Sequence, residues 1–71
     1  MEQKKYVFIK DYNCQYGTLR TGDEIITFRD NVYFNGGMVM PGYRSVLLNI
    51  INNDELRNQY LQRVQIIHNK V

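Results

Sequence analysis

The segment from Glu24 to Met40 constrains the fold of this chain more than any other. Its β-branched, aromatic and methionine residues are interrupted by two clusters of turn residues, Arg29-Asp30-Asn31 and Asn35-Gly36-Gly37. Such runs separated by Asn/Gly/Asp clusters are typical of strands joined by tight hairpin turns. The segment therefore predicts an antiparallel meander of three short strands.

The lengths of the two turns decide which side chains form the core. If both loops have three residues, the two-residue period of a strand collects the following residues on one face: Ile26, Phe28, Val32, Phe34, Met38 and Met40. Asn31 and Gly37 tolerate the positive φ that closes such a loop. A two-residue turn at Asn35-Gly36 is the competing arrangement, because Asn-Gly suits a type I′ turn; it opposes Phe34 to Gly37 and mixes the faces. We favour the three-residue loops.

With that register, the opposite face of the meander carries Ile25, Thr27, Tyr33 and Val39. It is less apolar, but it is far from the charged surface expected of a sheet that is covered on one side only. We expect the rest of the chain, a second copy of it or a functional partner to cover this face.

The remaining chain predicts one strand before the meander and two helices after it. Residues 6–10 are β-branched and aromatic, whereas residues 11–22 predict an irregular excursion from which Leu19 returns to the core. Beyond Pro41, apolar residues at helical spacing predict a helix over 43–52. Asn53 as N-cap, with Asp54 and Glu55 in the first turn, predicts a second helix over 54–64. Residues 65–71 suit either a short edge strand or a segment that packs on another subunit.

We therefore expect a single α+β domain over residues 1–71. Its small, twisted antiparallel sheet has about four strands, near 6–10, 24–28, 32–34 and 38–40. Both C-terminal helices pack on the Ile26 face of this sheet. They contribute the apolar side chains of Val46, Leu47, Ile50, Ile51, Leu56 and Leu61.

Size and composition limit what can stabilise and surround such a domain. Seventy-one residues lie near the lower limit for a self-sufficient core, and Cys14 has no second cysteine to pair with. We expect no metal, since His68 is the only histidine, and no cofactor. Self-association is then the common remaining support. The net charge of +2 and the lack of a long apolar run suggest a cytoplasmic protein without a membrane segment.

No group of residues predicts catalysis, so we do not expect an enzyme. A Cys14–His68 pair has the right residue types, but nucleophilic catalysis depends on their geometry. Asp23, Asp30 and Asp54 have simpler structural roles in turns and at a helix start. The glycines of Asn35-Gly36-Gly37 are explained by hairpin closure better than by a phosphate-binding nest.

Six tyrosines in a chain without tryptophan are the most functional-looking part of the composition. Tyrosine offers a large contact area with little rotamer entropy to lose, which suits protein interfaces. We expect a homo-oligomer that also binds another protein. The candidate interface residues are Tyr12, Tyr16, Tyr33, Ile25 and Val39.

Two alternatives belong to other functional classes. A small β domain can bind nucleic acid with aromatic platforms beside basic side chains; the candidates here are Lys4, Lys5, Lys10, Arg20 and Arg29. However, no nucleic-acid signature accompanies them, and lysines beside a strand also discourage edge pairing. The other alternative is a nucleotide-type ligand held between subunits by Tyr stacking and by Arg on phosphate.

The segments Gly17-Thr-Leu-Arg-Thr-Gly-Asp-Glu-Ile25 and Val32-Tyr-Phe-Asn-Gly-Gly-Met-Val-Met40 resemble small proteins carried by phages and prophages of Gram-positive bacteria. The resemblance covers about half of the chain and brings no functional residue with it. It implies a small accessory protein that acts by stoichiometric binding, for example on a host enzyme, a defence system or a replication factor.

Overall fold

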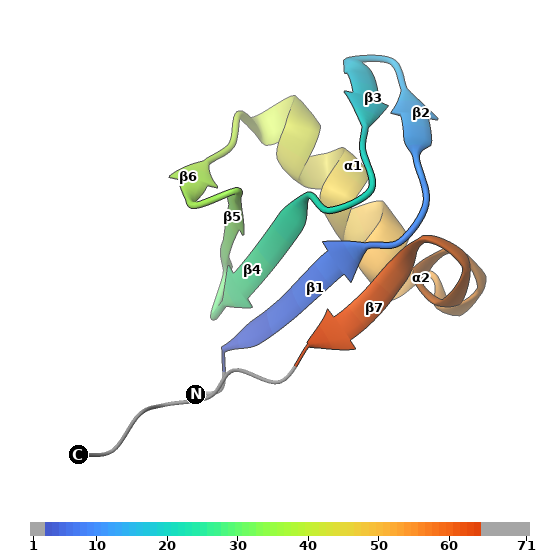
Figure 1. The fold of residues 1–71 in the computed structure, drawn as a ribbon. Helices are drawn as coiled ribbons and strands as arrows, with labels where there is room; N and C mark the ends of the chain where they lie inside the picture. Colours follow the sequence, from blue (N-terminus) through green and yellow to red (C-terminus); the bar gives the residue numbers. More distant parts are fainter. Residues whose placement is uncertain (1–2, 65–71) are drawn as a thin grey trace.

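The computed structural model describes residues 3–64 as a sheet backed by one long helix, with a separate small hairpin at one end (Figure 1). The strands are β1 (Lys4–Phe8), β2 (Tyr12–Cys14), β3 (Gly17–Leu19), β4 (Glu24–Phe28), β5 (Asn31–Phe34), β6 (Gly37–Met38) and β7 (Leu61–Val64). The helices are α1 (Pro41–Asn52) and α2 (Asp54–Tyr60). The predicted α+β class is confirmed.

The main sheet has five strands in the order β6-β5-β4-β1-β7, and β2 pairs with β3 in a separate two-stranded sheet. All neighbouring strands are antiparallel. Strand β7 follows both helices in the chain and returns to the free edge of β1, so the prediction of about four strands that all precede the helices is wrong.

The predicted three-residue loops are also wrong, because both meander turns have two residues. Phe28 pairs with Asn31 across the Arg29-Asp30 turn, and Phe34 pairs with Gly37 across the Asn35-Gly36 turn. Asn35 and Gly36 both have positive φ, at 50° and 88°, as a type I′ turn requires. The Asn35 side chain also accepts a hydrogen bond from the Glu24 backbone N–H at 2.9 Å, which fixes the turn against the start of β4.

The shorter turns exchange the predicted faces of β4 and β6. Ile25 now lies opposite Phe34, while Ile26 lies opposite Tyr33 and Tyr33 opposite Met38. A shift of one residue moves every side chain of a strand to the other face. The face toward α1, called the inner face below, therefore carries Ile25 rather than Ile26.

The core lies between the inner face and α1. Its buried side chains are Tyr6, Phe8, Leu19, Ile25, Val32, Leu47, Ile50, Ile51 and Leu61. The helical residues expected to supply the core are all either buried or packed against it, and Leu19 returns to it as predicted. Of the six meander residues predicted for the core, Val32 is buried and Phe34 packs against it. Ile26 and Phe28 lie on the opposite face instead, and Met38 and Met40 are 76% and 69% exposed.

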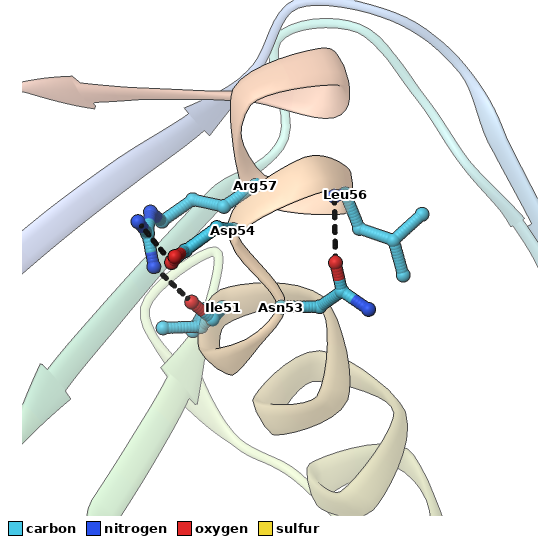
Figure 2. Close-up of polar contacts among 5 residues, drawn as sticks. All are labelled: Ile51, Asn53, Asp54, Leu56 and Arg57. Carbon is cyan, nitrogen blue, oxygen red and sulfur yellow. Dashed lines mark hydrogen bonds and ion pairs between the residues drawn. The ribbon is translucent and has the colours of Figure 1, made fainter.

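The junction of the two helices follows the predicted capping. Asn53 ends α1 and is the N-cap of α2, where its side-chain oxygen accepts a hydrogen bond from the Leu56 N–H at 3.1 Å (Figure 2). The Arg57 guanidinium donates to the Ile51 carbonyl at 2.8 Å and to the Asp54 carboxylate at 2.7 Å. These bonds fasten the second helix to the end of the first.

The predicted second helix, 54–64, ends early at Tyr60 because residues 61–64 pair with β1 instead. Leu61 lies opposite Phe8 and Arg63 opposite Tyr6. Without this pairing, the β1 edge would leave backbone groups without ladder partners. Helix α2 buries no side chain completely, although Leu56 and Tyr60 pack against the core. Its main contacts are with α1 and β7, so its packing differs from the expected pair of helices on one sheet face. The interpretation of 65–71 as a strand or a docking segment lies outside the described residues.

The hairpin β2–β3 is closed at its base by side-chain hydrogen bonds. The Asp11 carboxylate accepts hydrogen bonds from the Thr21 backbone N–H at 2.8 Å and from the Thr21 hydroxyl at 3.0 Å. These two bonds, with a smaller contribution from the charge of Arg20, hold the pKa of Asp11 below its ordinary value. The hairpin begins and ends at this contact.

Candidate functional site

The most distinctive surface of the described chain is the outer face of the five-stranded sheet, the face turned away from α1 (Figure 1). One row of side chains crosses every strand: Val64, Lys5, Ile26, Tyr33 and Met38. The strand alternation adds Val7 and Phe28 to the same face. None of its apolar side chains belongs to the core or packs against it, and no helix of residues 3–64 lies over them.

The charged groups of the outer face compensate one another. Lys5 Nζ lies 3.4 Å from the Glu24 carboxylate, in the middle of the sheet. Arg29 places its guanidinium 5.3 Å from the centre of the Phe28 ring, so its stem and charge shield one end of the face. The outer face is therefore apolar and close to neutral.

Of the predicted interface residues, Tyr33 lies on the outer face, half-buried among its neighbours. Ile25 does not take part in any surface, because it is fully buried in the core. This correction follows from the two-residue turns described above. Val39 is half-buried and packs against the core just before α1.

Tyr12 and Tyr16 pack against the two helices rather than on the sheet. The Tyr12 ring meets Tyr60 of α2 edge-on, with ring centres 4.9 Å apart, and Tyr16 stacks on Tyr43 of α1 at 5.4 Å. Tyr16 also crosses the helix start so closely that a Cβ at Gly42 would overlap its ring. Tyr16 is still 44% exposed, so the hairpin offers one aromatic side chain to a partner.

A shallow apolar cavity of about 290 Å³ lies near the sheet edge at β6, beside the tyrosine stack. It is lined by Phe34, Met38, Val39, Met40 and Tyr43. Flexible methionines adapt to irregular partner surfaces. Because Met38 belongs to both surfaces, the cavity extends the outer face at this edge.

The five residues proposed for nucleic-acid binding do not gather in one place. Adjacent residues of a strand point to opposite faces, so Lys4 and Lys5 separate, and Lys5 is paired with Glu24. Lys10 lies 5.5 Å from the Tyr60 ring centre, while Arg29 occupies the β4–β5 turn. These positions do not form the continuous basic stripe that a nucleic-acid backbone prefers.

A different basic cluster appears where β1, β7 and α2 meet. A cavity of about 310 Å³ is lined by Lys4, Tyr6, Arg57, Asn58, Leu61 and Arg63. Sequence reasoning missed it, since residues 61–64 were expected to continue a helix. No local signal pointed to it, because Leu61 and Val64 are three residues apart, a spacing that suits a helix better than a strand.

Residues 3–64 contain no group of three His, Cys, Asp or Glu side chains that is able to hold a metal ion. Cys14 is a half-buried free thiol, and His68, its possible catalytic partner, lies outside the described residues. Asp23 accepts a hydrogen bond from the Arg20 N–H at 2.8 Å, a turn role, and Asp54 pairs with Arg57. No helix in this part of the chain is long and apolar enough to cross a membrane.

Comparisons with protein-family models, with curated proteins and with solved structures found no match to this chain. The geometry of its own surfaces is therefore the basis for a functional proposal.

Proposed function

We propose that this protein is a non-catalytic binding module that docks a protein surface against the outer face of its main sheet, and that the first such partner is a second copy of the chain. The observation that supports this proposal is the row of largely apolar side chains that crosses the sheet, interrupted on β1 by Lys5, which no described element covers. The largest apolar patch on a small protein is often functional.

The charge pattern favours a second copy as the partner. The only opposite charges within 4 Å of each other on the face are Lys5 and Glu24, among the described residues. Two identical faces related by a two-fold axis can exchange these partners without like-charge contact. A strongly charged partner gains nothing from such a neutral surface.

The size of the face sets the expected strength. Five strands about 4.8 Å apart and at most about 17 Å long give a face of no more than roughly 400 Å² in projection. A standard stable interface buries about 800 Å² per partner, so the dimer is expected to be weak, with micromolar rather than nanomolar affinity. The cavity at Met38 extends the apolar area at one edge.

Sedimentation of the full chain across the micromolar range tests the proposal. The wild-type chain is expected to form dimers, and Ile26→Glu, which puts a charge in the middle of the face, to remain monomeric. Asn49→Glu is the matched control: it adds the same charge at an exposed position of α1 and is expected to dimerise normally. A wild-type monomer throughout, or equal loss in both variants, would overturn the dimer.

The phage-type resemblance extends this proposal to a small accessory protein that acts stoichiometrically on a host protein. In that case the same face, freed from its weak dimer, is the surface that meets the host partner. The Ile26→Glu variant tests this extension, because it is expected to lose binding to the host partner together with dimer formation.

A further inference from the structure

The basic cavity at the junction of β1, β7 and α2 is separate from the outer face, since its sheet residues lie on the inner face. Arg63 is directly opposite Tyr6, and Lys4 precedes Tyr6 by two residues on the same side of β1. Helix α2 adds Arg57 and Asn58 from above the strand ends. Three cations from three elements thus line one cavity.

Two of these three charges have no local counter-charge. Arg57 lies 2.7 Å from the Asp54 carboxylate, but no carboxylate of residues 3–64 lies within 4 Å of Lys4 or Arg63. Lys4 and Arg63 lie diagonally across the β1–β7 pair and both are exposed, so both charges are accessible to a ligand. An anion in the cavity is attracted by both of them.

The third cation is held in place before any ligand arrives. Arg57 donates to the Ile51 carbonyl and to Asp54, as Figure 2 shows, and these bonds use two of its five N–H donors. The others have no partner among residues 3–64. The Tyr6 hydroxyl likewise has no hydrogen-bond partner in this part of the chain, and the Tyr6 side chain lines the cavity although it is only 6% exposed.

We propose that Lys4, Arg57 and Arg63 form a binding site for a small phosphorylated molecule. Guanidinium groups bind phosphate oxygens through paired, charge-assisted hydrogen bonds, and lysine adds a mobile positive charge. A cavity of about 310 Å³ is at the lower end of the range of small-ligand sites, so it accepts one or two phosphate groups with a small substituent. A polymer requires a continuous groove, whereas these three cations surround a single half-open cavity.

Titration of the full chain with pyrophosphate at low salt, followed by amide NMR, tests the site. The largest shifts are expected at Lys4, Arg57, Asn58 and Arg63. Arg63→Gln is expected to weaken binding by roughly tenfold or more, because it removes charged hydrogen bonds. Arg20→Gln removes the same charge from an exposed loop and is expected to change affinity by less than about twofold, since exposed charges interact weakly in water.

A thermal melt of each variant by circular dichroism confirms that both fold, as expected for exposed positions. Absence of pyrophosphate binding at millimolar concentration, or equal weakening by both substitutions, would overturn the site. Adenosine monophosphate and a single-stranded oligonucleotide distinguish the ligand sources. Tighter binding of the nucleotide supports a small phosphorylated ligand. Tighter binding of the oligonucleotide, with loss in Arg20→Gln, overturns the cavity in favour of a broad electrostatic surface.

Discussion

The inner and outer faces of the main sheet come from the same strands but meet different surroundings. The inner row Tyr6-Ile25-Phe34 lies against α1 and the core, whereas the outer row Lys5-Ile26-Tyr33 meets no described element. Both rows carry large apolar or aromatic side chains. The apolar side chains of the inner face are therefore buried in the core and stabilise the fold. Those of the outer face are not covered by any described element.

The neighbours Ile25 and Ile26 give the most direct test of this difference. Ile25 is fully buried and Ile26 half-buried, and both are isoleucines of β4. Ile25→Ala is expected to lower the free energy of unfolding by roughly 2–5 kcal/mol, as for other buried large-to-small changes. Ile26→Ala is expected to lower it by less than about 1 kcal/mol.

Urea unfolding measures both variants, at protein concentrations below the range in which dimers form. This precaution keeps loss of association apart from loss of folding stability. Equal effects of the two substitutions would contradict the assignment of the two faces.

The Asn35-Gly36 turn offers a smaller test, because its length decides which residues share a face. Gly36 has a φ of 88°, where a Cβ is strained, whereas Gly37 lies in β6 and an added Cβ would meet only the Phe34 carbonyl oxygen at 3.8 Å. Gly36→Ala is expected to destabilise by about 1–2 kcal/mol and Gly37→Ala by no more than about 0.5 kcal/mol.

Thermal unfolding of these two variants provides the measurement. The three-residue loop considered for this sequence requires the positive φ at Gly37 instead. A larger effect at Gly37 than at Gly36 would therefore favour the three-residue loop and contradict the assignment of side chains to the two faces.

The sequence predicted the elements of this fold better than their pairing. Strand β4, the end of α1 and the Asn53 cap follow from local signals, which act over a few residues. The register failed at the first turn because Arg29 takes a positive φ of 58°, which is uncommon for arginine. It failed at the second because the type I′ preference of Asn35-Gly36 outweighs the tolerance of Gly37 for a longer loop. Strand β7 failed because the need of β1 for a neighbour is a tertiary effect that no local pattern contains.

The same two failures explain what was missed at the candidate sites. The register error placed Ile25 on a surface and hid Ile26, so only Tyr33 of the sheet candidates lies on the outer face. The β7 error kept Arg63 on a helix, away from Lys4. Residue types suggested what kinds of contact the chain makes, whereas strand pairing decides which residues make them.

The smallest expected effect concerns the β2–β3 hairpin, which contributes Leu19 to the core. The hydrogen bonds from Thr21 lower the pKa of Asp11, so this carboxylate stabilises the hairpin above its ordinary pKa of 3.8, and the contribution is lost as the pH falls through the lowered value. Amide shifts of Thr21 and Leu19 are expected to titrate below about pH 4. Asp11→Asn is expected to remove the transition at Thr21, whereas Asp30→Asn, at another exposed turn aspartate, is expected to leave it unchanged. The hairpin contacts the core side of the sheet and not its outer face. An acid transition at Ile26 that disappears in Asp11→Asn would therefore show that the outer face is coupled to the core.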